Sequence, residues 1–376
     1  MRTNVSGRSA GCNEVPLFGR RPLALMGKAF LSVAGAALIL LGGPLPVLSQ
    51  ESAWGLTAVS GLKVGHFTLS ERPTGCTVVL AEGGAVGGVD IRGGAPGTRE
   101  IALLDPVNSV QVVHAVVLSG GSAFGLDAAS GVVRYWDERD IGYRVGPNVV
   151  PIVVGAILFD LSIGDNARIR PDAECGYSAA SHASVETSPE GNVGAGAGAT
   201  VGKLRGSARA MKGGPGTASI TLDSGLTVAA IVAVNAVGDI IDPTTGTVIA
   251  GVRTSDGNGL ADSRVLLREG ALPAPQSVAN TTIGVVATNA TLTKAEATKV
   301  AQMAQDGLAR AIYPAHTPGD GDTVFSLATG TFSGAASVST IGALAADVMA
   351  EAIIRAVRAA TGIPGFPAAS DLNTGR

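Results

Sequence analysis

The sequence predicts a layered α/β fold, and three observations lead to this prediction. Short apolar runs bounded by Gly, Asn, Asp or Pro recur along the chain, as expected for buried strands. Longer stretches that place apolar residues on one helical face lie between and after these runs. The 376-residue chain has 53 glycines, and only 4% of its residues are aromatic. Such small residues let backbones approach closely, which favours strands and helices packed in layers over a helical bundle.

Five apolar runs are predicted to be the strands of this fold. They cover residues 112–118, 149–158, 226–234, 283–287 and 323–328. Because the runs are spread over most of the chain after the first fifty residues, we expect residues 50–376 to form one structural domain.

Three helices are expected around these strands. The first covers residues 122–140 and follows a Gly-Gly pair. The second begins at Thr293, which stands three residues before Glu296 in the spacing of a capping box. The third covers residues 340–362, with Gly362 as its end.

The first 49 residues have the layout of a signal peptide. Basic residues precede an apolar block at residues 29–41, and small residues follow it. This block is shorter than the roughly 20 residues that a membrane span needs, although a retained anchor stays an alternative. Arg20-Arg21 also leaves the twin-arginine route open. We therefore expect an exported protein, periplasmic or secreted, with no membrane attachment once the leader is removed.

Composition excludes several classes of partner. The net charge is −3 and no basic cluster exists, so neither nucleic acid nor an anionic membrane is expected to bind. The four histidines are scattered without metal-ligand spacing, and no metal or other cofactor is expected. The glycine-rich residues 191–206 lack the Gly-Lys-Ser/Thr ending of a phosphate loop. Cys76 and Cys175 remain after leader removal, and their pairing stays open.

Asn280-Thr281-Thr282 stands at the mouth of the strand predicted at residues 283–287. Two interpretations are open, and the simpler one is that β-branched residues suit the start of a strand. In the other, the chain breaks before Thr281, so that one residue carries both a hydroxyl and a free α-amino group. An α-amine with a pKa of about 7.7 to 8.0 suits a general base near neutrality. The segment 263–277 reads as an exposed loop, which fits a processing site.

Other polar residues have the chemistry that such a nucleophile needs. Asn235 ends an apolar strand, where its amide suits either an oxyanion donor or an ordinary turn. Asp320 and Asp322 flank a glycine, and the pair suits an acidic turn, a contact to an ammonium or hydroxyl, or calcium. The calcium alternative lacks further oxygen ligands. Dense glycine around Lys203 allows this side chain to approach another backbone.

Taken together, these motifs resemble one family of N-terminal-nucleophile hydrolases. It comprises the L-aminopeptidase/D-esterases, the β-peptidyl aminopeptidases and the nylon-oligomer hydrolases. The resemblance extends from residue 61 to residue 330. The motifs that carry it are GLKVGHFT (61–68), LSGGSAFGLDAASGV (118–132), VAVNAVGD (232–239), NTTIGVVATNA (280–290) and GLARAIYPAHTPGDGDTVFSLATG (307–330).

The resemblance implies a four-layer αββα sandwich made as a self-cleaving precursor. The break is expected between Asn280 and Thr281, because the family's nucleophile stands seven residues before the threonine that corresponds to Thr288. It would leave an α chain of residues 50–280 and a β chain of residues 281–376. The family's habit of assembly implies a homo-oligomer, a tetramer of such αβ units.

The resemblance also implies a role for each site residue. Asn235 corresponds to the oxyanion donor and Lys203 to the lysine beside the nucleophile in the nylon-hydrolase branch. Asp320 and Asp322 correspond to the acidic pair that orients the nucleophile and its amine. Phe159 corresponds to a substrate-binding position. It departs from the family, which often has a tyrosine here as a second oxyanion or substrate contact, because phenylalanine has no hydroxyl to offer.

The implied activity is cleavage of amide bonds in a small peptide or amide substrate through an acyl-Thr281 ester. N-terminal aminoacyl peptides and ω-amino-acid oligomers are both expected substrate classes, and the threonine, the lysine and the Asp-Gly-Asp segment favour the second. An exported binding protein of the same fold, without hydrolytic activity, is the alternative.

Overall fold

The structure is a computed structural model that describes residues 54–270 and 280–372. The described residues belong to one compact unit. The leader predicted at residues 1–49 lies outside them. Within the described ranges, every helix is too short or too polar to cross a bilayer.

Nine strands form one mixed sheet, in the order β10-β11-β14-β16-β2-β4-β7-β3, with β1 beside β2. The pairs β14–β16 and β4–β7 are parallel, and the other pairs are antiparallel. The strands are β1 (Leu62–Thr68), β2 (Gly75–Ile91), β3 (Thr98–Arg99), β4 (Val112–Ser119), β7 (Val153–Ile157), β10 (Gly214–Thr221), β11 (Thr227–Val234), β14 (Ile283–Thr288) and β16 (Thr323–Ala328).

The long strand β2 joins two halves of this sheet. Its first part pairs with β1 and its second part pairs with β16, while β4 runs beside both parts. One half therefore contains β1, β2, β4, β7 and β3, and the other contains β10, β11, β14 and β16.

Smaller sheets and helices complete the fold. The remaining strands are β5 (Tyr143–Val145), β6 (Asn148–Val150), β8 (Thr200–Val201), β9 (Met211–Lys212), β12 (Asp239–Ile241), β13 (Val248–Ala250) and β15 (Ile312–Tyr313). The α-helices are α1 (Ala128–Asp137), α2 (Ala173–Ser181), α3 (Ser263–Arg268), α4 (Lys294–Ala311) and α5 (Val338–Ala359).

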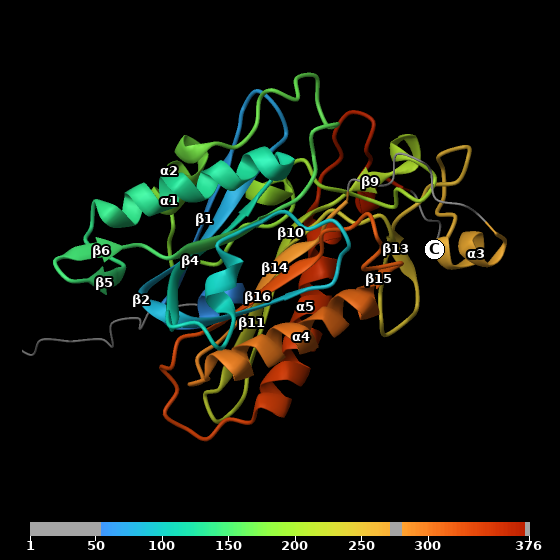
Figure 1. The fold of residues 1–376 in the computed structure, drawn as a ribbon. Coiled ribbons are helices and arrows are strands. Elements are labelled where there is room, and N and C mark those ends of the chain that lie inside the picture. Colours follow the sequence, from blue (N-terminus) through green and yellow to red (C-terminus); the bar gives the residue numbers. More distant parts are fainter. Residues whose placement is uncertain (1–53, 271–279, 373–376) are drawn as a thin grey trace, which may run out of the picture. The chain divides into compact units, whose positions relative to one another are not determined.

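Three buried apolar clusters separate four layers. One lies between helices α4 and α5 and the outer face of β11, β14 and β16. The second lies between the inner faces of the two sheet halves. The third packs α1 and α2 against β2 and β4. Figure 1 shows the strands between α1 and α2 on one side and α4 and α5 on the other. This arrangement confirms the αββα sandwich.

Alternation along single strands explains why both faces are apolar. In β11, Val228, Ala230 and Val232 face the helices, whereas Ala229 and Ile231 face the other half of the sheet. Successive strand residues point to opposite faces. A strand buried on both faces therefore reads as a continuous apolar run, which is the pattern that predicted four of the five strands.

The strand predicted at residues 149–158 is divided into two, and the loop predicted at residues 263–277 is wrong for its first part, which is helical. The first run divides at Pro151 into β6 and β7, because proline has no backbone N–H for a ladder. The second begins with helix α3, capped by the Asp262 carboxylate, which accepts from Arg264 N. Residues 271–279 of that segment lie outside the described residues.

The three predicted helices are present with shifted ends. Helix α4 has the predicted capping box between Thr293 and Glu296. In residues 122–140, a 3₁₀ helix (Ser122–Asp127) precedes α1. Helix α5 ends at Ala359 and leaves Gly362 outside it. Cys76 of β2 and Cys175 of α2 form a disulfide with a Cα–Cα distance of 6.3 Å, which resolves the open pairing.

Candidate active site

The sheet register brings the predicted site residues to one edge. Strands β14 and β16 run parallel with Ile283 opposite Thr323, so the residues just before them are neighbours. Strand β11 runs antiparallel to β14 with Ala233 opposite Ile283. The end of β11 therefore lies beside the start of β14. Asn280, Thr281, Asp320 and Asp322 precede their strands and Asn235 follows its own, which places all five at this edge.

Thr281 is buried, and its hydroxyl is turned onto the carbonyl of the bond predicted to break. Its Oγ1 donates to the Asn280 carbonyl oxygen. The Gly321 N–H lies 3.2 Å from that same oxygen and 3.2 Å from Thr281 Oγ1. The Thr281 N–H donates to the Asn235 carbonyl at 2.9 Å. The predicted nucleophile, the carbonyl that it would attack and an N–H that could stabilise an oxyanion thus lie together.

The neighbouring Thr282 has a different environment. Its backbone N–H donates to Asp322 Oδ1 at 2.8 Å. Its hydroxyl is buried and has no hydrogen-bond partner among residues 54–270 and 280–372. Of the two threonines, Thr281 is the one whose hydroxyl contacts the Asn280 carbonyl, at the bond predicted to break.

Lys203 and Asn235 form a buried pair. Lys203 Nζ lies 2.7 Å from Asn235 Oδ1 and 3.3 Å from the Asn235 carbonyl oxygen. Burial lowers the pKa of Lys203 to about 7, against the opposing charges of Asp320 and Asp160. Because the Asn235 carbonyl also accepts from Thr281 N, it links the lysine to the backbone nitrogen of Thr281.

The Asn235 amide is held from both ends. Its Oδ1 also accepts from Thr200 N at 3.0 Å, and its Nδ2 donates to the Phe159 carbonyl at 3.0 Å. Phe159 therefore contributes its backbone to the site, a contact that does not depend on the residue type of the ring. Gly202, with φ of +72°, lets the backbone next to Lys203 pack closely against Gly251. A Cβ at this position would lie 2.0 Å from the Gly251 carbonyl carbon.

The two aspartates have separate contacts. Asp320 Oδ2 accepts from Thr317 N at 2.8 Å and from Thr317 Oγ1 at 2.6 Å. Asp320 Oδ1 is buried without a partner in the described part of the chain. Burial, helped by the charge of Asp322, raises the pKa of Asp320 to about 6. Asp322 holds Thr282 N–H with one oxygen and His316 with the other.

Sequence reasoning missed two of these groups. His316 was treated as one of four scattered histidines, yet it contacts Asp322 directly. The Gly321 N–H is a backbone group, which no residue type reveals. The only available signal was their position in the segment that resembles the family's acidic motif. Within the described ranges, no three His, Cys, Asp or Glu side chains gather as a metal site.

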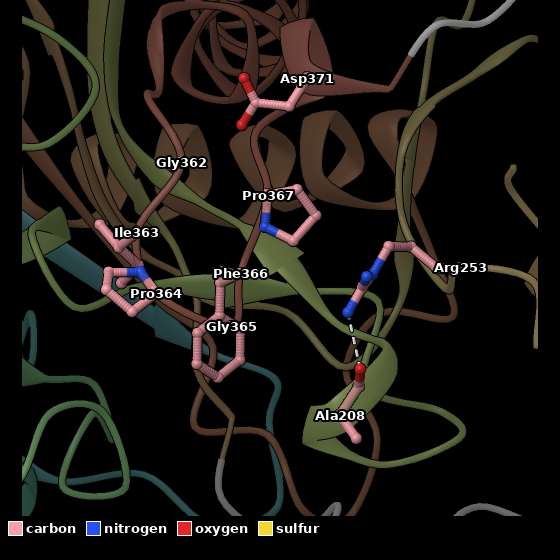
Figure 2. Close-up of a pocket in the computed structure, with 9 residues that line it drawn as sticks. All are labelled: Ala208, Arg253, Gly362, Ile363, Pro364, Gly365, Phe366, Pro367 and Asp371. Carbon is pink, nitrogen blue, oxygen red and sulfur yellow. Dashed lines mark hydrogen bonds between the residues drawn. The ribbon is translucent and has the colours of Figure 1, made fainter. Parts of the chain in front are cut away.

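A surface depression elsewhere contains none of these residues (Figure 2). Its charged side chains already have partners: Arg253 donates to the Ala208 carbonyl at 2.6 Å, and Asp371 accepts from Ala368 N at 2.8 Å. The depression is lined by Ala208, Arg253, Gly362, Ile363, Pro364, Gly365, Phe366, Pro367 and Asp371.

We expect Gly321→Ala to slow both self-cleavage and turnover by about 10- to 100-fold. An added Cβ would lie 2.8 Å from Thr281 Oγ1 and 2.7 Å from the Ala95 carbonyl oxygen, so the hydroxyl must shift. Gly83→Ala is the matched control, because nothing lies within 4 Å of its Cβ position. Time courses on denaturing gels measure the first rate. Equal rates for both variants would contradict the placement of Gly321.

We expect the free energy of unfolding to rise between pH 7 and pH 9. Burial lowers the pKa values of Lys203 and Lys212 to about 7 from 10.5. Below pH 7 the folded and unfolded chains both hold these protons. Above it the folded chain releases them first, so stability rises by up to about 1.4 kcal/mol per pH unit and lysine. Asp320, with a pKa of about 6, titrates below this window.

Urea unfolding of the Thr281→Val variant measures this slope, because an uncut chain unfolds as one piece. Adding Lys203→Met should reduce the slope by one lysine's share. A flat or falling stability from pH 7 to pH 9 would contradict the buried placement of these amines.

The chain is similar in sequence to known proteins. A family model described as peptidase family S58 matches residues 55–370. The chain belongs to peptidase family S58. An uncharacterized aminopeptidase of Mycobacterium leprae is 46% identical over 354 residues, covering 83% of this chain and 92% of that protein. A 6-aminohexanoate-oligomer endohydrolase of Kocuria sp. is 32% identical over 312 residues, covering 79% and 84%.

Solved structures of other proteins share the S58 chain's fold. The L-aminopeptidase D-Ala-esterase/amidase of Ochrobactrum anthropi, described as a variant of the Ntn hydrolase fold, matches with a TM-score of 0.62 and 21% identity. The match covers 83% of this chain and 88% of that one. A β-aminopeptidase of Burkholderia sp. also matches with a TM-score of 0.62, at 23% identity over 82% and 87%. The protein is thus an aminopeptidase or amidohydrolase of family S58 with this fold.

Proposed function

We propose that this protein is a self-processing N-terminal threonine hydrolase of amide bonds. The observation that carries the proposal is the Thr281 hydroxyl on the Asn280 carbonyl, with the Gly321 N–H at both oxygens. The cut between Asn280 and Thr281 gives an α chain of residues 50–280 and a β chain of residues 281–376.

Self-cleavage proceeds by an N-to-O shift. Thr281 Oγ1 attacks the Asn280 carbonyl carbon, and the Gly321 N–H stabilises the oxyanion. Collapse breaks the bond between the Asn280 carbonyl carbon and Thr281 N. The nitrogen takes up the proton that Oγ1 has lost and becomes a free amine, while the Asn280 acyl group remains on Oγ1 as an ester. Water then hydrolyses this ester to the Asn280 carboxylate and restores the Thr281 hydroxyl.

Turnover uses the nitrogen that cleavage sets free. Thr281 N already lies 2.9 Å from the Asn235 carbonyl, which would hold the new amine beside its own hydroxyl. The amine takes the hydroxyl proton as Oγ1 attacks the substrate carbonyl, and the Asn235 amide stabilises the oxyanion. Lys203 orients Asn235 through Oδ1. Asp322 fixes the strand start and Asp320 offers the amine a carboxylate. Collapse then breaks the substrate C–N bond, and the Thr281 ammonium gives the proton to the leaving amine. Water finally hydrolyses the acyl-Thr281 ester, which releases the acid and restores the hydroxyl.

Two substrate classes follow, and ω-amino-acid oligomers are favoured. The relatives' names point to aminopeptidases and to hydrolysis of 6-aminohexanoate oligomers. The buried lysine and the Asp-Gly-Asp segment favour the oligomer class. Cut protein should be assayed with 6-aminohexanoate oligomers and with aminoacyl p-nitroanilides, including β- and D-residues. Faster turnover of the anilides would assign the aminopeptidase class, and inertness toward both panels would leave the binding-protein alternative.

The protein is exported and assembles as a homo-oligomer in this proposal. The leader composition of residues 1–49 supports export to the periplasm or the medium. The family resemblance supports a tetramer of αβ units. An exported amide hydrolase suits the scavenging of small peptides or amides outside the cell.

A further inference from the structure

We propose that His316 is a positioning residue of this site, acting on the nucleophile through Asp322. The inference rests on the proposed function and adds a residue to it. Both the backbone N–H and the Nδ1 of His316 contact Asp322 Oδ2, at 3.0 Å and 2.9 Å. The other oxygen of Asp322 accepts from Thr282 N at 2.8 Å. His316 is therefore one carboxylate away from the residue that follows the nucleophile.

The protonation pattern follows from these contacts. Thr282 N–H and His316 N–H both donate to Asp322, so the carboxylate acts as an acceptor. In neutral His316 the proton must then lie on Nδ1, which leaves Nε2 as the unprotonated nitrogen. With three donors, the carboxylate has little freedom to rotate. Its Oδ1 consequently holds Thr282 N–H, and with it the start of β14, in place.

The backbone at His316 shows that this contact is built into the fold. His316 has φ of 57°, in the left-handed region that is uncommon for residues other than glycine, although histidine is enriched there with Asn and Asp. The side chain is only 17% exposed, and Nε2 is buried without a hydrogen-bond partner among the described residues. In this conformation both the backbone N–H and Nδ1 of His316 reach the same carboxylate oxygen, so the turn is shaped around Asp322.

Four substitutions separate this role from a purely conformational one. His316→Asn accepts the left-handed backbone and keeps a side-chain N–H where Nδ1 stands. His316→Asp has the same shape and backbone preference but offers a negative charge to Asp322. His316→Gly satisfies the backbone without a donor. His316→Ala has neither property.

Self-cleavage rates and kcat and KM should be measured on the full chain, with thermal melts to confirm folding. We expect the Ala, Gly and Asp variants of His316 to lower the self-cleavage rate and kcat by about 10- to 100-fold, with KM nearly unchanged. The His316→Asn variant should keep at least about a third of the wild-type values. Recovery with Gly equal to that with Asn would reduce His316 to a turn residue. Low activity of a folded His316→Asn variant, or wild-type rates in all four variants, would also overturn the proposal. An uncut wild-type chain would instead refute the proposed function.

Discussion

Thr281→Val is expected to give a chain that stays uncut and has no measurable activity. Valine keeps the shape of threonine but has no hydroxyl to attack the Asn280 carbonyl. Loss of the nucleophile lowers kcat on the order of 10⁶-fold in serine hydrolases, and a similar loss is expected here. Denaturing gels and an oligomer-hydrolysis assay measure both effects. Thr281→Ser keeps the hydroxyl and should still be cut.

Thr282→Val is the matched control for this prediction. It makes the same chemical change one residue later, where the hydroxyl has no partner in the described part of the chain. The backbone contact of Thr282 with Asp322 is retained. This variant should be processed and keep turnover within about 3-fold, because no hydrogen bond is lost. An uncut Thr282→Val beside a processed Thr281→Val would transfer the role of nucleophile to Thr282.

Lys203→Met should lower kcat by about 100-fold and change KM little. Without Nζ, Asn235 Oδ1 keeps only the Thr200 N–H, and the amide that would hold the oxyanion loses its orientation. The loss of one oxyanion-hole donor typically costs about 10²–10³ in kcat. Steady-state kinetics on cut protein measure the effect, and circular dichroism confirms the fold.

Lys294→Met controls for the loss of a buried lysine. Lys294 is 4% exposed and also donates to two backbone carbonyls, those of Leu103 and Asn108, but it has no contact with Asn235 or Thr281. The Lys294→Met substitution should destabilise the chain and leave kcat within about 2-fold of the wild-type value. Equal kinetic losses in the two variants would show that Lys203 acts only through stability.

The sequence predicted strands that are continuous apolar runs better than strands that glycine or charged residues interrupt. Strands β4, β11, β14 and β16 are continuous apolar runs, because both faces of each strand are buried. Strand β2 escaped prediction: its middle contains Glu82, Gly83 and Gly84, and these interrupt the apolar pattern just where the strand passes from one sheet half to the other.

The candidate site was also predicted only in part, in its side chains but not in its backbone contacts. Thr281, Asn235, Lys203, Asp320 and Asp322 carry their chemistry in the side chain, so residue type and motif order pointed to all five. The contacts that make them a site come largely from backbone groups. The Gly321 N–H and the carbonyls of Phe159 and Asn235 are set by sheet register and turn geometry, which no residue type encodes.

The central claim is that the chain cuts itself between Asn280 and Thr281. The most direct measurement is the intact mass of purified wild-type protein, expressed without its leader and denatured to separate its chains, with N-terminal sequencing of the smaller one. We expect two chains whose masses sum to the precursor plus one water, the smaller beginning at Thr281 and ending at Arg376. A single uncut chain, or a smaller chain that begins at Thr282, would contradict the claim.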